Sequence, residues 1–426
     1  MKRNSASYTI TGFPTIKEQM LYWVSGNSFC SFLDNQGYSS VHQSYDCLAA
    51  AGALRIFNGP DGIQQINQFT ANEKDWLFGH ISFDAFNTST TTKDNPVGFN
   101  TLSFFQPETV LQLDAGHLII QTTRESPESI FREIIAIDVS AVSAGIKLAP
   151  VKMIPRISRE EYISTVKKLK AHIQRGDCYE LNFCQEFFSE NVTTDCLSLY
   201  KKLSALSPNP FSCYYRQWHA HLACASPERF LRRKGNNLIS QPIKGTKPRN
   251  TKNSAADHVL REELFMCSKE RAENVMIVDL VRNDLSKICK EGTVEVEELF
   301  GIYSFPQVHQ MISTVKGEID PTALFSDIIA ATFPMGSMTG APKKKVLELI
   351  HQYEPVSRGL FSGAVGYIDP DNNFDFNVVI RSLLYNAASK YLSYQVGSGI
   401  THYCNPEDEY EECLLKALAL NAILEK

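Results

Sequence analysis

Residues 158–176, with the sequence SREEYISTVKKLKAHIQRG, mark the point at which the chain changes character. Ser158, with Glu161 three residues later, forms a capping-box pattern, in which each side chain accepts a hydrogen bond from the other residue's free backbone N–H. Apolar residues then recur at helical spacing, and Gly176 follows as a stop signal. The stretch therefore predicts a helix whose apolar face consists of Tyr162, Ile163, Val166, Leu169 and Ile173.

Downstream of this helix, blocks of strand and blocks of helix follow each other without strict alternation. Apolar runs predict strands over residues 180–188, 211–218, 221–225, 237–243, 362–385 and 391–400. Helix-favouring stretches predict helices over residues 254–288, 343–351 and 407–424. Pro342, just before the second of these, suits a first helical turn. This order predicts an α+β fold.

Upstream of residue 158 the sequence predicts mainly strands. The first 150 residues are rich in Phe, Ser, Thr and Asn and predict short strands and turns, for example over residues 76–83 and 118–123. A stretch around 148–155 contains Pro and Lys and is a candidate boundary. We therefore expect a strand-rich N-terminal region, residues 1–150, and a second domain, residues 151–426.

The composition of the chain excludes several classes of function. With 426 residues, 43% of them hydrophobic and 21% charged, the chain is unlike a disordered, collagen-like or coiled-coil protein. Its net charge of −5 lacks the basic footprint of nucleic-acid binding. No apolar run approaches the roughly 18 residues of a membrane span, and the first residues lack a signal-peptide core. The eleven cysteines show no CxxC spacing, so we expect a reducing, cytoplasmic setting with neither nucleic acid nor membrane as partner.

Two pairs of glutamates on predicted helices are candidates for a metal site. Glu270 and Glu273 are three residues apart, as are Glu409 and Glu412, and residues at this spacing share one helix face. Two such helices facing each other would supply the oxygen ligands that Mg²⁺ prefers. A Glu-x-x-Glu pair is more often a solvated helix face, but the apolar run of residues 275–278 beside the first pair favours a partly buried helix.

Two further candidate residues stand at predicted strand ends. Lys244, within QPIKGT (241–246), follows an apolar strand and precedes a glycine turn. Such a lysine is usually a solvated surface charge. If it lines a cavity instead, desolvation would lower its pKa from about 10.4 and free a nucleophilic amine. Glu228, within SPER (226–229), is either the structural partner of an arginine or a general acid or base.

Two glycine-rich segments complete the candidates. Gly397-Ser398-Gly399 either leaves backbone N–H groups open to a carboxylate or forms a plain turn. Residues 334–343, PMGSMTGAPK, do not have the GxxxxGK[ST] spacing of a Walker loop. These residues together indicate a Mg²⁺-dependent enzyme that acts on a small anion.

In chain order, these segments resemble the chorismate-utilising enzymes, a family that includes the anthranilate, aminodeoxychorismate, isochorismate and salicylate synthases. The matching motifs are GDCY (176–179), SPERF (226–230), PIKGT (242–246), RAEN (271–274), VDL (278–280), RND (282–284), GSMTGAPK (336–343), IRS (380–382) and EYEE (409–412). They cover residues 158–420, and the N-terminal region is similar only loosely. The resemblance implies a chorismate-binding catalytic domain over residues 151–426. It also implies an α+β fold of the anthranilate/aminodeoxychorismate synthase type, with two opposed antiparallel β-sheets flanked by helices.

The residue at position 244 distinguishes the branches of this family. Aminodeoxychorismate synthases typically carry lysine there, whereas anthranilate synthases usually carry alanine. The resemblance therefore implies amination of chorismate at C4 to 4-amino-4-deoxychorismate, on the route to p-aminobenzoate and folate. Lys244 would attack C2 as the C4 hydroxyl leaves, and ammonia would then attack C4 and expel the lysine. Glu228 would protonate the leaving hydroxyl, a role that needs a carboxyl group partly protonated near neutral pH.

The resemblance also assigns roles in metal and substrate binding. Glu273 and Glu412 look like direct Mg²⁺ ligands, and Glu270 and Glu409 look like holders of metal-bound waters. The ion would clamp the ring carboxylate of the substrate, and Arg381 looks like the partner of the enolpyruvyl carboxylate. The other substrate-binding residues implied by the family are Gly245, Thr246, Thr339, Gly397, Gly399 and Lys416.

Three positions depart from the family pattern. Gln310 stands where relatives commonly have a histidine, so either the neighbouring His309 substitutes for it or the site works without an imidazole. Phe361 stands where many anthranilate synthases have a tyrosine. Glu180 replaces a usual glutamine, at the position where the isochorismate and salicylate branch has the lysine that activates water.

The missing glutaminase motif bears on the source of ammonia, and two alternative functions remain open. The sequence has no Gly-x-Cys-x-Gly turn with a trailing His-x-Glu, so we expect ammonia to come from a separate glutamine amidotransferase subunit. One alternative is anthranilate synthase component I, which adds ammonia at C2 and eliminates pyruvate. The other is a non-catalytic chorismate-binding regulatory subunit. Residues 31–34, SFLD, match the Leu-Leu-Glu-Ser motif of tryptophan-regulated relatives poorly, which disfavours tryptophan regulation.

Overall fold

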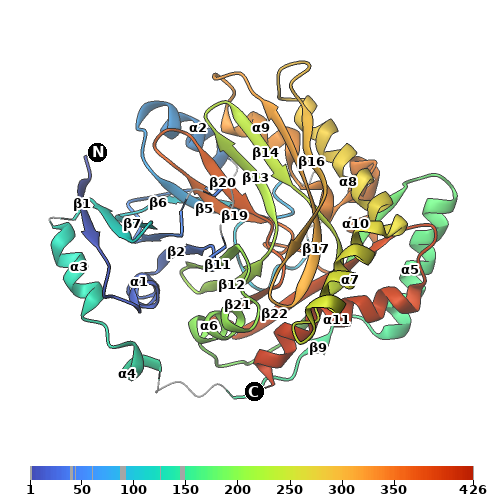
Figure 1. Ribbon diagram of the computed structural model, residues 1–426, viewed down its shortest axis with the longest axis horizontal. Coiled ribbons are helices and arrows are strands. Elements are labelled where there is room, and N and C mark those ends of the chain that lie inside the picture. The colour runs from blue at the N-terminus through green and yellow to red at the C-terminus, as the bar shows by residue number, and fades with distance from the viewer. Residues whose placement is uncertain are drawn as a thin grey trace.

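Two antiparallel β-sheets that face each other form the centre of the protein (Figure 1). The computed structural model describes residues 2–38, 42–43, 45–59, 61–86, 93–124, 126–143 and 149–425. Within these residues one sheet has 12 strands and the other has 10. Helices flank both sheets, so the predicted α+β class with two opposed antiparallel sheets is confirmed.

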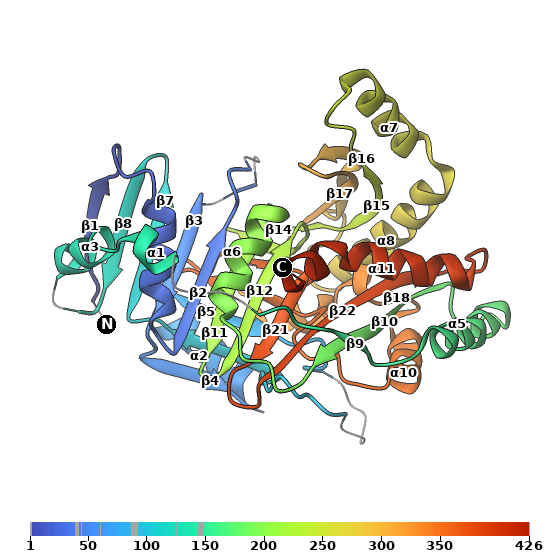
Figure 2. The same ribbon diagram turned by 90° about the horizontal axis from the view of Figure 1, so that it is seen from below.

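The 12-stranded sheet extends from the N-terminal strands at one edge to β10 and β18 at the other (Figure 2). Its strands, in order across the sheet, are β1 (Asn4–Thr9), β8 (His117–Thr122), β7 (Thr109–Asp114), β3 (Cys47–Ala51), β2 (Phe29–Asp34), β11 (Phe211–Gln217), β12 (Ala220–Ser226), β21 (Ser382–Asn386), β22 (Tyr391–Ile400), β10 (Glu180–Ser189) and β18 (Gly340–Ala341), and β9 (Ile154–Pro155) also pairs with β10. The long strands β10 and β22 pair from Leu181 opposite Ile400 to Ser189 opposite Leu392.

The 10-stranded sheet packs against the first sheet along the strands from β7 to β10. Its strands, in order, are β15 (Ile243–Pro248), β17 (Val308–Glu318), β14 (Asn237–Gln241), β13 (Arg229–Lys234), β20 (Phe374–Asn377), β19 (Ala364–Ile368), β5 (Leu77–Ile81), β6 (Leu102–Gln106) and β4 (Arg55–Asn58), and β16 (Glu295–Ser304) also pairs with β17. Both sheets contain strands from either side of residue 150, because β2 pairs with β11 and β5 pairs with β19.

The helices pack on the outer faces of the sheets. They are α1 (Ile16–Ser25), α2 (Gly62–Asn72), α3 (Pro127–Ile135), α4 (Val139–Ser143), α5 (Arg159–Gln174), α6 (Cys196–Leu206), α7 (Ser254–Met266), α8 (Ser268–Ser286), α9 (Phe325–Thr332), α10 (Lys343–Tyr353) and α11 (Pro406–Leu424), with a 3₁₀ turn at Gly336–Met338. Helices α1, α3, α5, α6 and α11 contact the 12-stranded sheet, and α2, α7 and α8 contact the 10-stranded sheet. Helices α8 and α11 thus flank the end of the molecule where β15, β17, β10 and β22 meet (Figure 2).

Two large apolar clusters hold these layers together. One lies between the 12-stranded sheet and its helices, with buried Phe32, Leu181 and Leu420. The other fills the space between the two sheets, where Leu222 of one sheet and Phe104 of the other are fully buried. Burial of this apolar area is the main favourable contribution to folding, and the second cluster fixes the distance between the two sheets.

The helix predicted from the capping box is confirmed as α5. The backbone N–H of Glu161 donates to Oγ of Ser158 at 3.1 Å, and the N–H of Ser158 donates to Oε2 of Glu161 at 2.7 Å. The predicted helices over 343–351 and 407–424 are confirmed as α10 and α11.

The structure refines one prediction of secondary structure and corrects another. The helix-favouring stretch 254–288 is helical and forms two helices, because Cys267 has extended backbone angles, φ −66 and ψ 109, between α7 and α8. The first 150 residues contain helices α1, α2 and α3 as well as strands. Helix α1 is held by packing, since it buries Ile16, Met20 and Val24 at helical spacing against the sheet.

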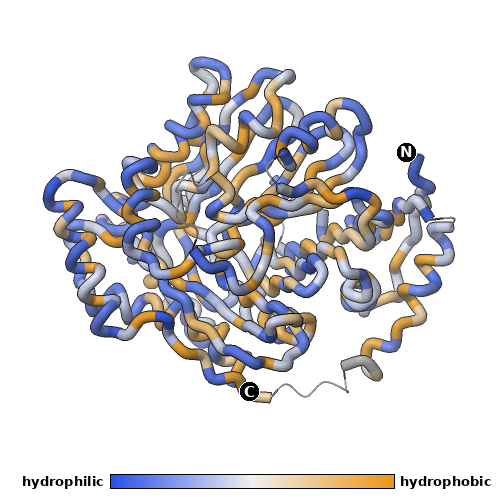
Figure 3. The backbone as a smooth tube through the Cα atoms, turned by 180° about the vertical axis from the view of Figure 1, so that it is seen from behind, coloured by the Kyte–Doolittle hydropathy of each residue, from blue (hydrophilic) through white to orange (hydrophobic). Residues whose placement is uncertain are grey.

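Hydrophobic and hydrophilic residues are interspersed along the chain (Figure 3). Among the described residues, no helix has both the length and the apolar content needed to span a membrane.

Candidate active site

Lys244 enters the site from β15, the edge strand of the 10-stranded sheet. The pairing of β15 with β17 shifts register between Ile243 and Thr246, so the strand is irregular where the lysine stands. Gly245 has φ +99, and a Cβ atom there would lie 3.1 Å from Oε2 of Glu270. Glycine is therefore needed for the backbone conformation and for the close approach of α8.

Lys244 and Glu180 form an ion pair that joins the two sheets. Nζ of Lys244, on the 10-stranded sheet, donates to Oε1 of Glu180, on β10 of the 12-stranded sheet, at 2.7 Å. The two side chains are 14% and 2% exposed. Oε2 of Glu180 is buried and has no hydrogen-bond partner within the part of the chain that the structure describes. Lys244 is therefore a mostly buried lysine with one bonded carboxylate, rather than a solvated surface charge.

The charges around Lys244 set its pKa. Burial disfavours the ammonium form and acts to lower the pKa. The carboxylates of Glu180, Glu273 and Glu412 act in the opposite direction and prevail, so the pKa of Lys244 is raised above its ordinary value. The prediction of a lowered pKa is wrong for the free protein, because the sequence shows the desolvating strand but not the carboxylates that the fold brings to it.

Glu228 lies in the connection between β12 and β13, and it is buried. Its backbone N–H donates to Oγ of Ser226 at 3.2 Å, and its carbonyl accepts from the N–H of Val378 at 3.0 Å. Burial raises the pKa of Glu228 to about 7, against the lowering effects of Ser337 and Lys244. A carboxyl group with this pKa is partly protonated at neutral pH, which suits a general acid.

Arg381 supplies a half-buried positive charge near Glu228. Its backbone has φ +50, a conformation that arginine rarely adopts and that is typical of functional sites. Burial lowers the pKa of the guanidinium to about 10, with Glu228 acting in the opposite direction. Its guanidinium makes no hydrogen bond or ion pair with any residue in the described ranges. A half-buried guanidinium whose donors are free fits a carboxylate, which it can bind in a bidentate manner.

Gly397 and Gly399 lie within β22, where it pairs with β10, so the interpretation of this segment as a turn is wrong. A Cβ atom on Gly397 would collide with Sγ of Cys184. A Cβ atom on Gly399 would lie 2.9 Å from Nζ of Lys244 and 3.2 Å from Oε1 of Glu180. The glycine at 399 therefore leaves the room that the ion pair occupies.

Four glutamates from α8 and α11 lie on the same side of the site as Lys244. Burial raises the pKa of Glu273 to about 7. Burial also raises the pKa of Glu270 and of Glu409, and the carboxylate of Glu412 adds to both shifts. Glu270 of α8 and Glu412 of α11 thus interact electrostatically across the site.

These glutamates are a donor set for a metal rather than a closed coordination sphere. Lys416 holds Oε1 of Glu412 at 2.7 Å, and Nζ of Lys269 lies 3.9 Å from Oε1 of Glu273. In the described part of the chain, no three His, Cys, Asp or Glu side chains converge as they would around a metal ion. The residues fit Mg²⁺ by their chemistry, because carboxylate oxygens are its preferred protein ligands. The raised pKa values also reflect negative charge that a cation would offset.

The other predicted substrate-binding residues lie close by, with different surroundings. Thr246 is exposed on β15. The hydroxyl of Thr339 donates to the carbonyl of Met335 at 3.0 Å, so it is used within its own loop. Lys416 donates to the carbonyl of Gly397 at 2.8 Å and thereby ties α11 to β22.

His309 is held by side chains on two other elements. Its Nε2 lies 3.0 Å from Oδ1 of Asp257, and its Nδ1 lies 2.9 Å from Oγ of Ser304. Gln310 is paired with Thr246 across β15 and β17, and its buried Oε1 has no hydrogen-bond partner among the described residues. Both ring nitrogens of His309 are therefore engaged with other side chains.

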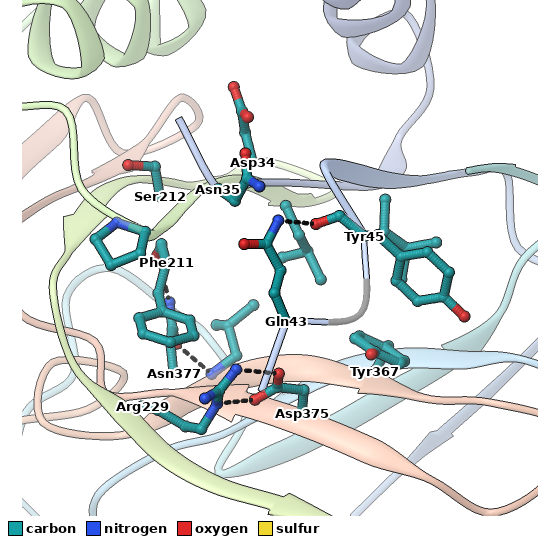
Figure 4. A pocket seen from close by; sticks show the side chains of 14 residues that line it. Asp34, Asn35, Gln43, Tyr45, Phe211, Ser212, Arg229, Tyr367, Asp375 and Asn377 are labelled. Atoms are coloured by element: carbon teal, nitrogen blue, oxygen red, sulfur yellow. Dashed lines mark hydrogen bonds and ion pairs between the residues drawn. The ribbon is translucent and has the colours of Figure 1, made fainter. Parts of the chain in front are cut away.

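Arg229, the residue after Glu228, lines a separate cavity of about 80 Å³ (Figure 4). There it binds Asp375 through two hydrogen bonds of 2.9 and 3.0 Å. Asp34 and Asn35 line the opposite part of this cavity. None of the lining residues identified in the described ranges belongs to the predicted catalytic or metal-binding set, so this cavity is distinct from the site at Lys244.

At one end of the two opposed sheets, the site combines the lysine Lys244, the buried acid Glu228 and the unbonded guanidinium of Arg381. The glutamates of α8 and α11 lie beside them. Residues 25–422 match the family model of chorismate binding enzymes. The chain belongs to this family.

Individual relatives carry the names of two branches. An anthranilate synthase component I-like protein of Synechocystis is 35% identical over 82% of this chain and 72% of its own length. Aminodeoxychorismate synthase component 1 of Bacillus subtilis is also 35% identical, over 63% of this chain and 56% of its own. Among solved structures, the menaquinone-specific isochorismate synthase of Escherichia coli has a TM-score of 0.78, with 17% identity over 100% of this chain and 94% of its own. The last comparison shows the fold alone.

Proposed function

We propose that the protein aminates chorismate at C4 and forms 4-amino-4-deoxychorismate. The observation that carries this proposal is the buried Lys244, which stands between the two sheets with a buried acid, Glu228, and a free guanidinium, Arg381, around the same site. A nucleophilic lysine explains how an amine can replace the C4 hydroxyl at the same carbon. The lysine first adds at C2 as the hydroxyl leaves C4, and ammonia then adds at C4 as the lysine leaves C2. The relative named aminodeoxychorismate synthase component 1 points in the same direction.

The first displacement joins the substrate to the protein. The neutral amine of Lys244 attacks C2, the ring double bonds shift, and the C4 hydroxyl departs. Glu228 gives its proton to that hydroxyl, so that water leaves, and its pKa of about 7 supports this role. Arg381 holds a substrate carboxylate through its unused donors and orients the ring against Lys244.

The second displacement releases the product. Ammonia attacks C4, the double bonds shift back, and the bond between C2 and the nitrogen of Lys244 breaks. The lysine leaves as a neutral amine. The ammonium group formed at C4 loses a proton, which restores the acid form of Glu228. The sum of the two displacements is chorismate plus ammonia to 4-amino-4-deoxychorismate plus water.

Two further components belong to this proposal. Glu273 and Glu412 would bind Mg²⁺ directly, and Glu270 and Glu409 would bind its waters. When bound, the ion supplies a positive charge that holds the ring carboxylate and offsets its charge. A separate glutamine amidotransferase subunit would supply ammonia, and ammonium salts at mildly alkaline pH would replace it in vitro.

Mass spectrometry of the products tests the proposed function. The protein is incubated with chorismate, Mg²⁺ and ammonium, and we expect 4-amino-4-deoxychorismate. Anthranilate with an equal amount of pyruvate would instead identify the chain as an anthranilate synthase component I. Binding of chorismate without any product, also after a glutamine amidotransferase subunit is added, would identify a non-catalytic regulatory subunit.

A further inference from the structure

Lys244 is not a nucleophile in the state that the free protein holds. Its amine is held in an ion pair with the carboxylate of Glu180, with Nζ of Lys244 2.7 Å from Oε1 of Glu180, and the lysine of such a pair carries its proton. An ammonium group has no lone pair, so it cannot attack carbon. The proposed reaction therefore requires that one proton leaves Nζ before or during the attack on C2.

Glu180 is placed to receive that proton. Within the described residues, Oε1 of Glu180 is the one atom to which Nζ of Lys244 donates a hydrogen bond, at 2.7 Å. Glu273 and Glu412 act on Lys244 through their charge, without a hydrogen bond to Nζ. The second oxygen of Glu180 is buried without a partner in the described ranges, so no protein donor there competes for the charge of the carboxylate.

The backbone on both sides of this contact is fixed. Glu180 pairs with Ala341 of β18, and a Cβ atom on the neighbouring Gly340 would collide with the carbonyl of Glu180. On the other side, Gly399 leaves open the volume in which Nζ of Lys244 meets Oε1. The contact is thus built on four strands in two sheets, β10, β15, β18 and β22, and these strands hold Nζ in one place.

We propose that Glu180 is a positioning residue that aims Nζ of Lys244 at the substrate and takes one proton from it as the amine attacks. This inference rests on the proposed function, because it supplies the proton acceptor that the first displacement lacks. It also gives a physical reason for the glutamate that stands in place of the usual glutamine of related sequences. An amide oxygen holds an ammonium group but is a far weaker base than a carboxylate.

The proton balance closes over one turnover. Lys244 passes a proton to Glu180, which becomes a neutral acid, and the amine forms its bond to C2 while the C4 hydroxyl leaves with the proton of Glu228. When ammonia has attacked C4, the bond between C2 and the lysine nitrogen breaks and the amine departs neutral. Glu180 then returns its proton to Lys244, and the ion pair is restored.

The test compares Glu180→Gln with the wild type. Glutamine keeps the shape and a hydrogen-bond acceptor but removes the base. Glu186→Gln is the matched control, because Glu186 is also a buried, ion-paired carboxylate on β10, held by Arg156 at 2.7 Å. It lies six residues from Glu180, which is about 20 Å along a strand. For each protein, kcat and KM for chorismate are measured with ammonium salts across a pH series, and the product is identified.

We expect Glu180→Gln to lower kcat on the order of 100-fold at neutral pH, the usual contribution of a positioned base. Its KM for chorismate should change little. As the pH rises, the ratio of the wild-type kcat to the variant kcat should also fall, by about tenfold for each unit of pH. The variant must lose the proton of Lys244 to solvent, whereas the wild type passes it to Glu180. Glu186→Gln should retain the kcat and pH profile of the wild type.

Two results would overturn the inference. One is a Glu180→Gln variant that makes 4-amino-4-deoxychorismate at or above the wild-type rate, which would mean that the carboxylate only restrains the lysine. The other is a lowered kcat whose ratio to the wild type does not change with pH, which would mean a purely structural role. If the variant does not fold, Glu180→Asp decides, because it withdraws the carboxyl group by one methylene. A wild-type kcat and pH profile in Glu180→Asp would also overturn the inference. If the wild type forms anthranilate, the proposed function itself is wrong, whatever either variant does.

Discussion

The charge of Glu228 should destabilise the folded protein above neutral pH. Burial raises the pKa of this carboxyl group from 4.5 to about 7. A group whose pKa is higher in the folded state binds its proton more tightly there, so folding stability falls as the pH rises from 4.5 to about 7 and then stays constant. This difference in pKa corresponds to about 3 kcal/mol of unfolding free energy.

Replacing Glu228 with glutamine removes this cost. We expect Glu228→Gln to be more stable than the wild type by about 3 kcal/mol above pH 7, and almost equally stable near pH 4.5. For a chain of 426 residues the unfolding entropy is about 0.9 kcal/mol/K, so Tm should rise by about 3 °C above neutral pH. Turnover should fall at least on the order of 100-fold in the same variant, because the acid for the C4 hydroxyl is lost.

Calorimetry across the pH range measures this effect. Wild type and Glu228→Gln are unfolded by heat near pH 4.5, near pH 7 and at about pH 8. Glu291→Gln, which changes a carboxyl group on the exposed surface, is the control for the loss of one charge. Two results would refute the claim that burial raises the pKa of Glu228. One is a Tm of Glu228→Gln at or below that of the wild type at about pH 8, and the other is an increase in Tm that is the same at every pH.

Two further substitutions test the geometry of the site. Gly399→Ala places a methyl group 2.9 Å from Nζ of Lys244 and should lower kcat on the order of 100-fold by displacing it. Gly26→Ala is its control, because a Cβ atom there meets only ordinary contacts. Equal kcat values for the two variants in steady-state kinetics would contradict the close contact at Gly399. Arg381→Gln removes the carboxylate partner and should raise KM for chorismate roughly 30-fold, a loss of about 2 kcal/mol. An unchanged KM and unchanged chorismate binding in calorimetric titrations would exclude this role.

Local sequence signals predicted those parts of the fold that depend on neighbours in the chain. The capping box of α5 is such a signal, because Ser158 and Glu161 satisfy each other's backbone groups within one turn. The break between α7 and α8 has no such signal, since Cys267 is neither proline nor glycine. The pairing of β2 with β11 joins segments far apart in the chain, so periodicity alone could not predict it. The arrangement of two opposed sheets came from the resemblance to a family.

The same distinction applies to the site. The spacing of Glu270 and Glu273 placed two carboxylates on one helix face, and they lie there. The contact of Lys244 with Glu180 joins residues 64 positions apart in different sheets. The sequence therefore offered only the unusual glutamate as a signal. The raised pKa of Lys244 could not be predicted either, because it depends on the sum of three carboxylates from different elements.

Mass spectrometry of the intact protein tests the central claim most directly, because that claim is a covalent bond between Lys244 and the substrate. The protein is incubated with chorismate and Mg²⁺ while ammonia is withheld, and the reaction is stopped by denaturation. We predict a mass increase equal to chorismate less one molecule of water, on the peptide that contains Lys244. Adding ammonium before the stop should remove the adduct and release 4-amino-4-deoxychorismate, and Lys244→Ala should form neither. Formation of 4-amino-4-deoxychorismate by Lys244→Ala at the wild-type rate, with no adduct on the wild type, would contradict the account.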